Sequence, residues 1–210
     1  RAEAQASGAR LGVNLGKGKD TPLERAAEDY TALVRRYAAR ADYLAVNISS
    51  PNTPALRQLQ TRTFITGLLR AVTAERDRQP VRVPVLVKIA PDLSEPEIDD
   101  VLDAVSAANV DGLIATNTTL SREGLPDFAR RLAGGLSGAP LRDRATAVIA
   151  YLARRTHGRL PIVGVGGIMT PDDALAKLDA GAVLIQLYTG LVYAGPGLAR
   201  AINRRLLARR

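Results

Sequence analysis

The chain contains no cysteine and a single histidine, and both scarcities restrict its chemistry. The absence of cysteine excludes disulfides, thiolate–metal bonds and a thiol nucleophile. With His157 alone, a histidine metal cluster is excluded and a Ser-His-Asp triad is disfavoured. Any proton transfer in this protein therefore depends on a less usual base.

Aromatic residues are also scarce, with six Tyr, two Phe and no Trp among 210 residues. The formal net charge is +8 and comes almost entirely from arginine. Nucleic acids and anionic membranes attract such a charge. However, the arginines are scattered along helical patterns and no aromatic residues are interleaved with them. These features favour a solvated basic surface and predict no nucleic-acid partner.

Charged residues are missing from residues 180–199, a run about as long as a bilayer is thick. The run contains four glycines, Pro196 and Gln186, so a buried strand, a loop and a helix start explain it better than a membrane span. The length and the 46% hydrophobic content predict one sizeable core. Residues 1–210 are therefore expected to form a single domain.

Six short apolar segments alternate with segments of helical periodicity. Strands are expected at residues 13–15, 43–46, 83–89, 111–116, 161–165 and 182–187. Capping-box patterns at residues 21–24 and 94–97 predict the starts of two helices. This alternation is typical of parallel strands joined by crossover helices.

Every expected strand ends in polar residues or glycine, which favours a (β/α)8 TIM barrel over a doubly wound sheet with one switch point. A barrel has eight strands and six are found. The fold class expected is α/β, with six of the eight β/α units of a TIM barrel and the two N-terminal strands missing.

The most polar strand end is YLAVNISSPNT, residues 43–53, where an apolar run changes abruptly into amides and hydroxyls. Such groups suit a planar heterocycle with alternating donors and acceptors. Carboxylates are absent from the strand ends, so no metal site is predicted. Asp92 lies just beyond a strand and is interpreted as a turn residue. The candidate amides and hydroxyls are Asn14, Asn47, Asn52, Asn117, Thr116, Thr118 and Thr119.

Lys88 lies near the end of an otherwise apolar strand. A lysine at such a position is costly unless it meets an anion or hydrogen-bond acceptors. A side chain that extends to solvent is the simplest alternative. A lyase that forms a Schiff base on Lys88 is a second alternative.

Three glycine-containing segments follow the later strands, at residues 134–138, 164–167 and 186–190. Glycine lets the backbone approach an anion closely, and the helix after Gly167 is expected to add its N-terminal dipole. Together they predict a phosphate site. None is a Walker A or GxGxxG sequence, so a nucleoside triphosphate or a Rossmann cofactor is not indicated.

Seven segments resemble the dihydroorotate dehydrogenases, flavin enzymes of pyrimidine (UMP) biosynthesis. They cover every expected strand end in order: GVNLGKGKDTP, ADYLAVNISSPNT, VLVKIAPDLS, DGLIATNTT, GGLSGAPLRD, PIVGVGGI and QLYTGLVYAGPGL. The resemblance implies a barrel that binds FMN and oxidises dihydroorotate to orotate by hydride transfer to flavin N5. A base on the opposite side of the substrate removes the C5 proton.

One branch of that family uses cysteine as the base, and the quinone-dependent branch uses serine. Ser50 stands at the matching position, so the chain resembles the quinone-dependent (class 2) branch. The resemblance implies substrate contacts from Asn47, Asn52, Asn117 and Thr118. It implies FMN contacts from Asn14, Asn47, Lys88, Thr116, Gly138, Gly167, Tyr188 and Thr189.

The resemblance also implies a quinone partner that docks through an N-terminal segment missing here, and peripheral association with the cytoplasmic side of the cell membrane. The isolated chain is expected to bind FMN weakly and to have an open barrel edge. Two further interpretations stay open: another FMN-barrel reductase of pyrimidine-like substrates, and an inactive fragment.

Overall fold

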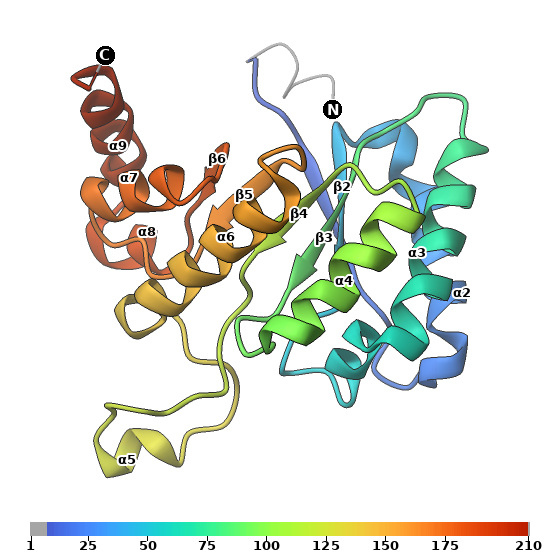
Figure 1. Ribbon diagram of the computed structural model, residues 1–210, viewed down its shortest axis with the longest axis horizontal. Coiled ribbons are helices and arrows are strands. Elements are labelled where there is room, and N and C mark those ends of the chain that lie inside the picture. Colours follow the sequence, from blue (N-terminus) through green and yellow to red (C-terminus); the bar gives the residue numbers. More distant parts are fainter. Residues whose placement is uncertain (1–7, 210) are drawn as a thin grey trace. The chain divides into compact units, whose positions relative to one another are not determined.

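The computed structural model describes residues 8–209, and residues 1–7 and 210 lie outside the described part (Figure 1). The chain divides into two compact units. The first comprises Arg1–Ile89 with Leu93–Gly112, and the second comprises Ala90–Asp92 with Leu113–Arg210. The expectation of one domain over residues 1–210 stays a prediction.

The first unit contains three parallel strands in the order β1-β2-β3. Crossover helices connect them, as the alternation of apolar and amphipathic segments predicts. The strands are β1 (Gly12–Leu15), β2 (Tyr43–Asn47) and β3 (Val85–Ile89). The helices are η1 (Leu23–Arg25), α2 (Ala26–Tyr37), η2 (Ala38–Arg40), η3 (Leu56–Gln60), α3 (Arg62–Asp77) and α4 (Glu95–Ala107).

The two faces of this sheet differ because side chains alternate along a strand. Leu15, Val46 and Val87 share one register level and are at most 1% exposed. Asn14, Asn47 and Lys88, each one position away, point to the other face; Asn14 is exposed, and Asn47 and Lys88 are partly buried. The apolar face is the core of the unit, and the polar face is left for the candidate site.

One of the two predicted capping boxes is confirmed. The Ser94 backbone N–H donates to Glu97 Oε2 at 2.7 Å, and α4 begins after Ser94. The box predicted at residues 21–24 is wrong, because η1 follows Pro22 without a side-chain cap. Lys17 Nζ donates to the Thr21 carbonyl oxygen, so Thr21 belongs to the preceding loop.

The second unit also contains three parallel strands, in the order β4-β5-β6. They are β4 (Gly112–Ala115, whose first residue belongs to the first unit), β5 (Ile162–Val165) and β6 (Leu184–Gln186). The helices are α5 (Asp127–Arg130), η4 (Ala139–Leu141), α6 (Arg142–Thr156), α7 (Pro171–Asp179), α8 (Thr189–Ala194) and α9 (Gly197–Leu207). Figure 1 shows α5 at the tip of a long excursion of the chain between β4 and α6.

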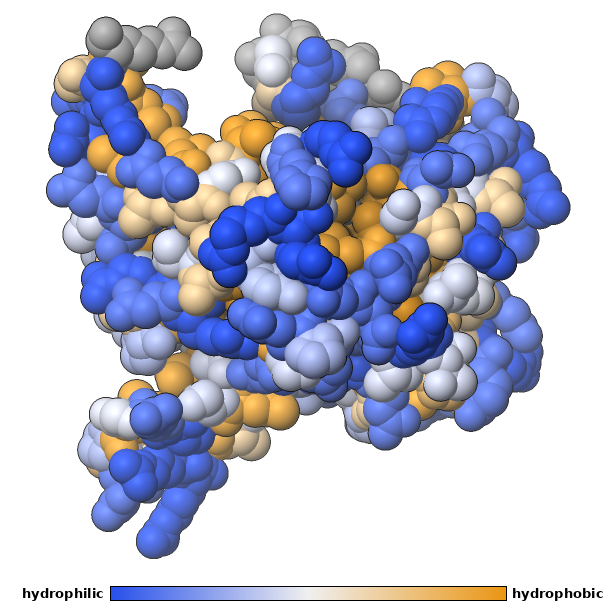
Figure 2. Space-filling model, viewed as in Figure 1, coloured by the Kyte–Doolittle hydropathy of each residue, from blue (hydrophilic) through white to orange (hydrophobic). Residues whose placement is uncertain are grey.

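The uncharged run of residues 180–199 is divided among β6, α8 and the start of α9. Across residues 8–209, no helix has both the length and the apolar character that a membrane span requires. Leu198 of α9 packs into a small core with Ile168, Ala174 and Ile202. In the view of Figure 2, the outward faces of the helices are mainly hydrophilic.

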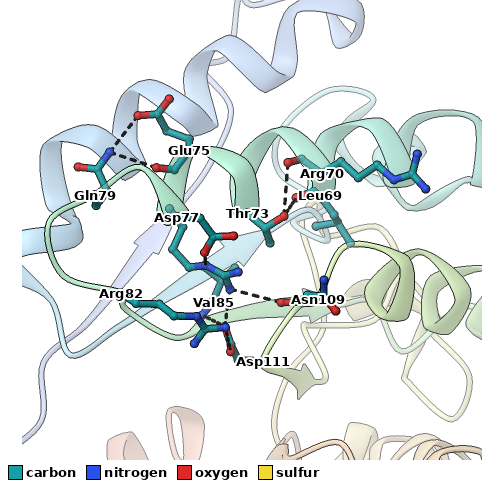
Figure 3. Close-up of polar contacts among 11 residues, drawn as sticks. Leu69, Arg70, Thr73, Glu75, Asp77, Gln79, Arg82, Val85, Asn109 and Asp111 are labelled. Atoms are coloured by element: carbon teal, nitrogen blue, oxygen red, sulfur yellow. Dashed lines mark hydrogen bonds and ion pairs between the residues drawn. The ribbon is translucent and has the colours of Figure 1, made fainter.

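Arg76 of α3 is buried at the centre of a polar network in the first unit. Figure 3 labels its partners Asp77, Asn109 and Asp111. Its Nη1 donates to Asp111 Oδ2 at 2.7 Å, and its Nε donates to Asp77 Oδ1 at 2.8 Å. Asp111 also accepts from the Val85 N–H at 2.8 Å and from Arg82 Nη2 at 2.6 Å. The network ties α3 to the beginnings of β3 and β4, at the end opposite the polar strand ends.

Replacement of Asp111 by alanine is expected to lower the free energy of unfolding by about 3 kcal/mol, because it leaves Arg76 buried with one charged partner fewer and the Val85 N–H unpaired. Urea denaturation measures the loss. Asp77→Ala is the matched control, since the Asp77 side chain is 55% exposed. Its expected loss is within about 1 kcal/mol. Equal losses in the two variants would contradict the central role of Asp111.

Candidate functional site

The polar face of the first unit gathers three of the predicted site residues. Asn47 of β2 and Lys88 of β3 are register partners at the carboxyl ends of their strands. Asn14 of β1 is the partner of Ala45, two residues before Asn47. Because side chains two residues apart share a face, Asn14, Asn47 and Lys88 lie on the same side of the sheet. These residues are 33 and 41 positions apart in the sequence, and neither that spacing nor their residue types predict a shared face.

Asn47 is held in place by the residues around it. Its Oδ1 accepts from Ser49 Oγ at 3.1 Å and from the Ser49 N–H at 3.3 Å. Its carbonyl oxygen accepts from the Tyr30 hydroxyl of α2 at 2.8 Å. Burial raises the pKa of Tyr30 above its ordinary value, so the hydroxyl remains protonated and donates. The end of β2 is therefore a rigid position for a ligand-binding amide.

Ser50 and Asn52 lie in the turn that follows β2. Ser50 is half-buried, and its Oγ accepts from the Asn52 N–H at 3.2 Å. Arg57 Nε donates to the Ser49 carbonyl oxygen at 3.0 Å and holds the turn against η3. An N–H directed at a hydroxyl oxygen favours its deprotonated form, which is the electrostatic help that a serine base requires.

Lys88 is half-buried, and within residues 8–209 it makes no hydrogen bond or ion pair. Burial lowers the pKa of Lys88 below its ordinary value. A partly desolvated ammonium without an anion is unfavourable in the unliganded chain. This geometry fits a site that receives negative charge from a ligand.

The second unit carries the polar end of β4. Thr116 is 2% exposed and its Oγ1 donates to the Asn117 carbonyl oxygen at 3.0 Å. Asn117 Oδ1 accepts from the Thr118 N–H at 2.8 Å. Thr116, Asn117 and Thr118 therefore form one short, internally bonded segment in which Asn117 and Thr118 are half-buried.

The three glycine-containing segments converge within the second unit, as the sequence predicts. Thr189 Oγ1 donates to Ser137 Oγ at 2.9 Å, and a Cβ on Gly138 would lie 3.1 Å from Thr189 Cγ2. A Cβ on Gly190 would lie 2.2 Å from the Ile168 carbonyl oxygen. Gly167 has a φ of +72°, and a Cβ there would lie 2.2 Å from Arg142 Cα. At Gly167 and Gly190 protein atoms occupy the space that a side chain would need, and glycine turns of this kind can direct backbone N–H groups at a phosphate.

The start of α7 differs from the expectation that its dipole faces an anion. Thr170 and Asp173 form a capping box, and Asp173 Oδ2 accepts from the N–H groups of Met169 and Thr170 at 3.0 and 2.9 Å. The chain's own carboxylate thus occupies the N-terminus of α7. The donors left for a phosphate belong to the glycine turns.

Asp92 is more than the turn residue that the sequence indicates. Its Oδ1 accepts from Thr119 Oγ1, and its Oδ2 accepts from the Leu120 N–H at 3.0 Å. Thr119 also pairs with Leu136 through two backbone hydrogen bonds, which close the excursion that carries α5. Asp92 therefore anchors the segment directly after Asn117 and Thr118. It also lines a cavity of about 550 Å³ with Thr119 and Arg144.

The remaining predicted residues have simpler surroundings. The Tyr188 side chain is 79% exposed at the start of α8. His157 is exposed at the C-terminal cap of α6, with a φ of +52°. Among residues 8–209, no three acidic or histidine side chains are grouped so that they could hold a metal ion.

Comparisons with known proteins agree with this geometry. A family model described as dihydroorotate dehydrogenase matches residues 1–209. A dihydroorotate dehydrogenase (quinone) of Anaeromyxobacter sp. (strain Fw109-5) is 55% identical over 204 residues, which are 95% of this chain and 56% of the relative. That of Chloroflexus aurantiacus (strain ATCC 29366 / DSM 635 / J-10-fl) is 55% identical over 205 residues, covering 94% of this chain and 56% of the relative. The chain thus spans little more than half the length of these curated relatives.

A crystal structure of DHODH from Eimeria tenella in complex with ferulenol is similar with a TM-score of 0.90 and 37% sequence identity. The match covers 95% of this chain and 58% of the Eimeria chain. The expected fold class, a partial (β/α)8 barrel, is confirmed.

Replacement of Lys88 by methionine is expected to raise the melting temperature of the ligand-free protein at pH 7. Below its lowered pKa, Lys88 is protonated in the folded state and its desolvation costs stability. Between that lowered pKa and 10.5, Lys88 is neutral in the folded state but still binds a proton in the unfolded state. The wild type therefore gains stability as pH rises through this range, and the difference in melting temperature between Lys88→Met and the wild type narrows. Lys19→Met, at an exposed lysine, is the control. A lower melting temperature for Lys88→Met would contradict an unpaired buried cation.

Replacement of Asp92 by alanine is expected to accelerate hydrogen exchange of the Leu120 amide by about tenfold or more, because a hydrogen bond to a carboxylate is lost. Exchange followed by mass spectrometry or NMR measures the change. Asp127→Ala is the matched control, since the Asp127 side chain is 91% exposed on α5. Unchanged exchange at Leu120 would show that Asp92 does not anchor this segment.

Proposed function

The chain belongs to the dihydroorotate dehydrogenase family, and from this premise we propose that the protein oxidises dihydroorotate to orotate, with FMN as its flavin and a quinone as electron acceptor. One observation carries the proposal: the Lys88 ammonium, which has no hydrogen-bond or ion-pair partner among residues 8–209, lies beside Asn47 on the polar sheet face, with Ser50 in the next turn. The family and the quinone in the relatives' names favour this reaction over another FMN-barrel reductase or a lyase.

The residues of the second unit fit the phosphate end of FMN. Gly138 and Gly167 have positive φ values of +80° and +72°, and turns of this kind can direct backbone N–H groups at phosphate oxygens. Thr189 lies against Gly138 and adds a hydroxyl, and Tyr188 adds its backbone at the start of α8. This set is proposed to hold the ribityl phosphate.

The first unit fits the flavin ring. FMN, when bound, accepts the hydride at N5 and gains negative charge near N1 and O2. Lys88 is proposed to lie at that end, where its ammonium gains the counter-charge that the unliganded chain lacks. Asn14 and Asn47 share its sheet face and are proposed to bind flavin donors and acceptors, as is Thr116 at the end of β4.

Asn47, Asn52, Asn117 and Thr118 are proposed to bind the ring and carboxylate of the substrate. Ser50 is proposed to remove the C5 proton. Its Oγ already accepts from the Asn52 N–H, which stabilises the charge that develops on oxygen as the proton leaves. Because a serine hydroxyl holds its own proton tightly, a relay through Thr53 or a water molecule is proposed to carry that proton away.

The partners follow from the same premise. The quinone is inferred from the names of the relatives, and its docking through an N-terminal segment is inferred from the resemblance of the chain to the quinone-dependent branch. Peripheral association with the cytoplasmic side of the cell membrane is part of the proposal on the same basis.

The test is anaerobic mixing of the complete, flavin-loaded enzyme with dihydroorotate. The wild type is expected to lose its oxidised-flavin absorbance. Ser50→Ala is expected to lose it at least about a hundredfold more slowly, since a positioned base contributes about 10²–10⁴ to the rate. Ser106→Ala, at an exposed serine of α4, is the matched control. A wild type that binds FMN but is not reduced by dihydroorotate contradicts the proposed reaction, and full-rate reduction of Ser50→Ala contradicts Ser50 as the base.

A further inference from the structure

Lys177 of α7 is a completely buried lysine that the proposed reaction does not use. Its side chain packs against β5, because a Cβ on Gly164 would lie 3.1 Å from Lys177 Cβ. The chain contains four lysines and carries its surface charge on arginine. Lys19 alone among the four is exposed. A buried ammonium is costly, so its presence requires a physical reason.

The ammonium of Lys177 contacts only neutral oxygens in the described chain. It donates to the Arg142 carbonyl oxygen at 2.6 Å and to Thr146 Oγ1, both in the first turns of α6. Thr146 Oγ1 also donates to the same carbonyl at 2.8 Å, so this acceptor keeps a donor without Lys177. Hydrogen bonding alone therefore does not require a cation at this position.

Arg142 connects Lys177 to the glycine turns. The Cα of Arg142 lies against Gly167, at 2.2 Å from the position of an added Cβ. The Lys177 ammonium thus lies directly behind the residue that abuts Gly167. Lys177 is 0% exposed, so its ammonium is shielded from water.

Three charged side chains act on Lys177: Asp173, Asp143 and Arg142. Asp173 on its own helix and Asp143 on α6 favour its charged form, and Arg142 opposes it. Arg142 pairs with Asp173 at 3.2 Å and with Asp143 at 3.3 Å. Arg205 of α9 pairs with Asp172, and Arg209, just after α9, pairs with Asp179; both acids are exposed residues of α7. Without Lys177, the remaining Arg142, Asp143 and Asp173 would carry a net charge of −1 behind the phosphate site.

We propose that Lys177 is a buried counter-charge for the phosphate dianion bound at the Gly138 and Gly167 turns, acting through space without contacting it. The proposal rests on the proposed binding of FMN. An ammonium acts strongly on a nearby dianion in a site from which water is excluded. Lys177 is thus a positioning residue whose effect depends on the ligand having a phosphate.

The ligand pair FMN and riboflavin tests this, because the two differ by the phosphate alone. Both affinities are measured by flavin fluorescence quenching on the complete enzyme after removal of its flavin. In Lys177→Met, the FMN affinity is expected to fall roughly tenfold or more, while the riboflavin affinity changes less than about twofold. Lys177→Gln, which keeps a donor but not the charge, is expected to behave in the same way.

The pH dependence supplies a second readout. Burial lowers the pKa of Lys177 to about 8. The wild-type preference for FMN over riboflavin is therefore expected to fall as pH rises through about 8, and the preference of Lys177→Gln is expected to stay constant over that range.

The outcomes separate the two proposals. If both flavins lose affinity equally in the variants, or if neither does, Lys177 is structural and the inference is wrong while FMN binding stands. If the wild type binds neither flavin, the proposed function fails and this inference fails with it. Arg200→Met, at an exposed cation of α9, is the control for loss of positive charge.

Discussion

The candidate site depends on the register of three parallel strands. Because side chains alternate along each strand, one face of the first unit takes Leu15, Val46 and Val87 into the core, and the other face is free for Asn14, Asn47 and Lys88. A slip of one residue in β2 or β3 would exchange the two sets and destroy core and site together. The hydrophobic burial that stabilises this unit therefore also specifies where its polar groups lie.

Desolvated cations are the second recurring feature. Lys88 has no anionic partner in the described chain, and Lys177 is buried against neutral oxygens. Arg76, by contrast, is buried with Asp111 and Asp77 and belongs to the end of the strands away from the site. Arg76 keeps its charge beside two carboxylates, whereas Lys88 has no anion among residues 8–209 and Lys177 has acids nearby without a direct ion pair; these two lysines mark the places proposed to meet a flavin ring and a phosphate.

Local patterns were reliable where the chain itself supplies the physics. All six predicted strands are present, and the Ser94 capping box is correct. The strands predicted at residues 83–89, 111–116 and 182–187 are two or three residues longer than those observed. The box at residues 21–24 failed because Lys17 holds Thr21 in the loop. The sequence indicates only a turn residue at Asp92, because its partner Thr119 lies 27 residues away and no local pattern encodes that contact.

The β/α alternation, the family and the identities of the proposed ligand-binding residues can be read from the sequence, since periodicity and motif are local properties of the chain. The folded structure shows which residues share a face, which acid anchors the segment after Thr118, and that Lys88 has no anionic partner among residues 8–209. The physical reason is that register, burial and desolvation arise from contacts between residues tens of positions apart. The YLAVNISSPNT segment illustrates both: its amides and serine are visible in the sequence, but the pairing of Asn47 with Lys88 exists only in the folded sheet.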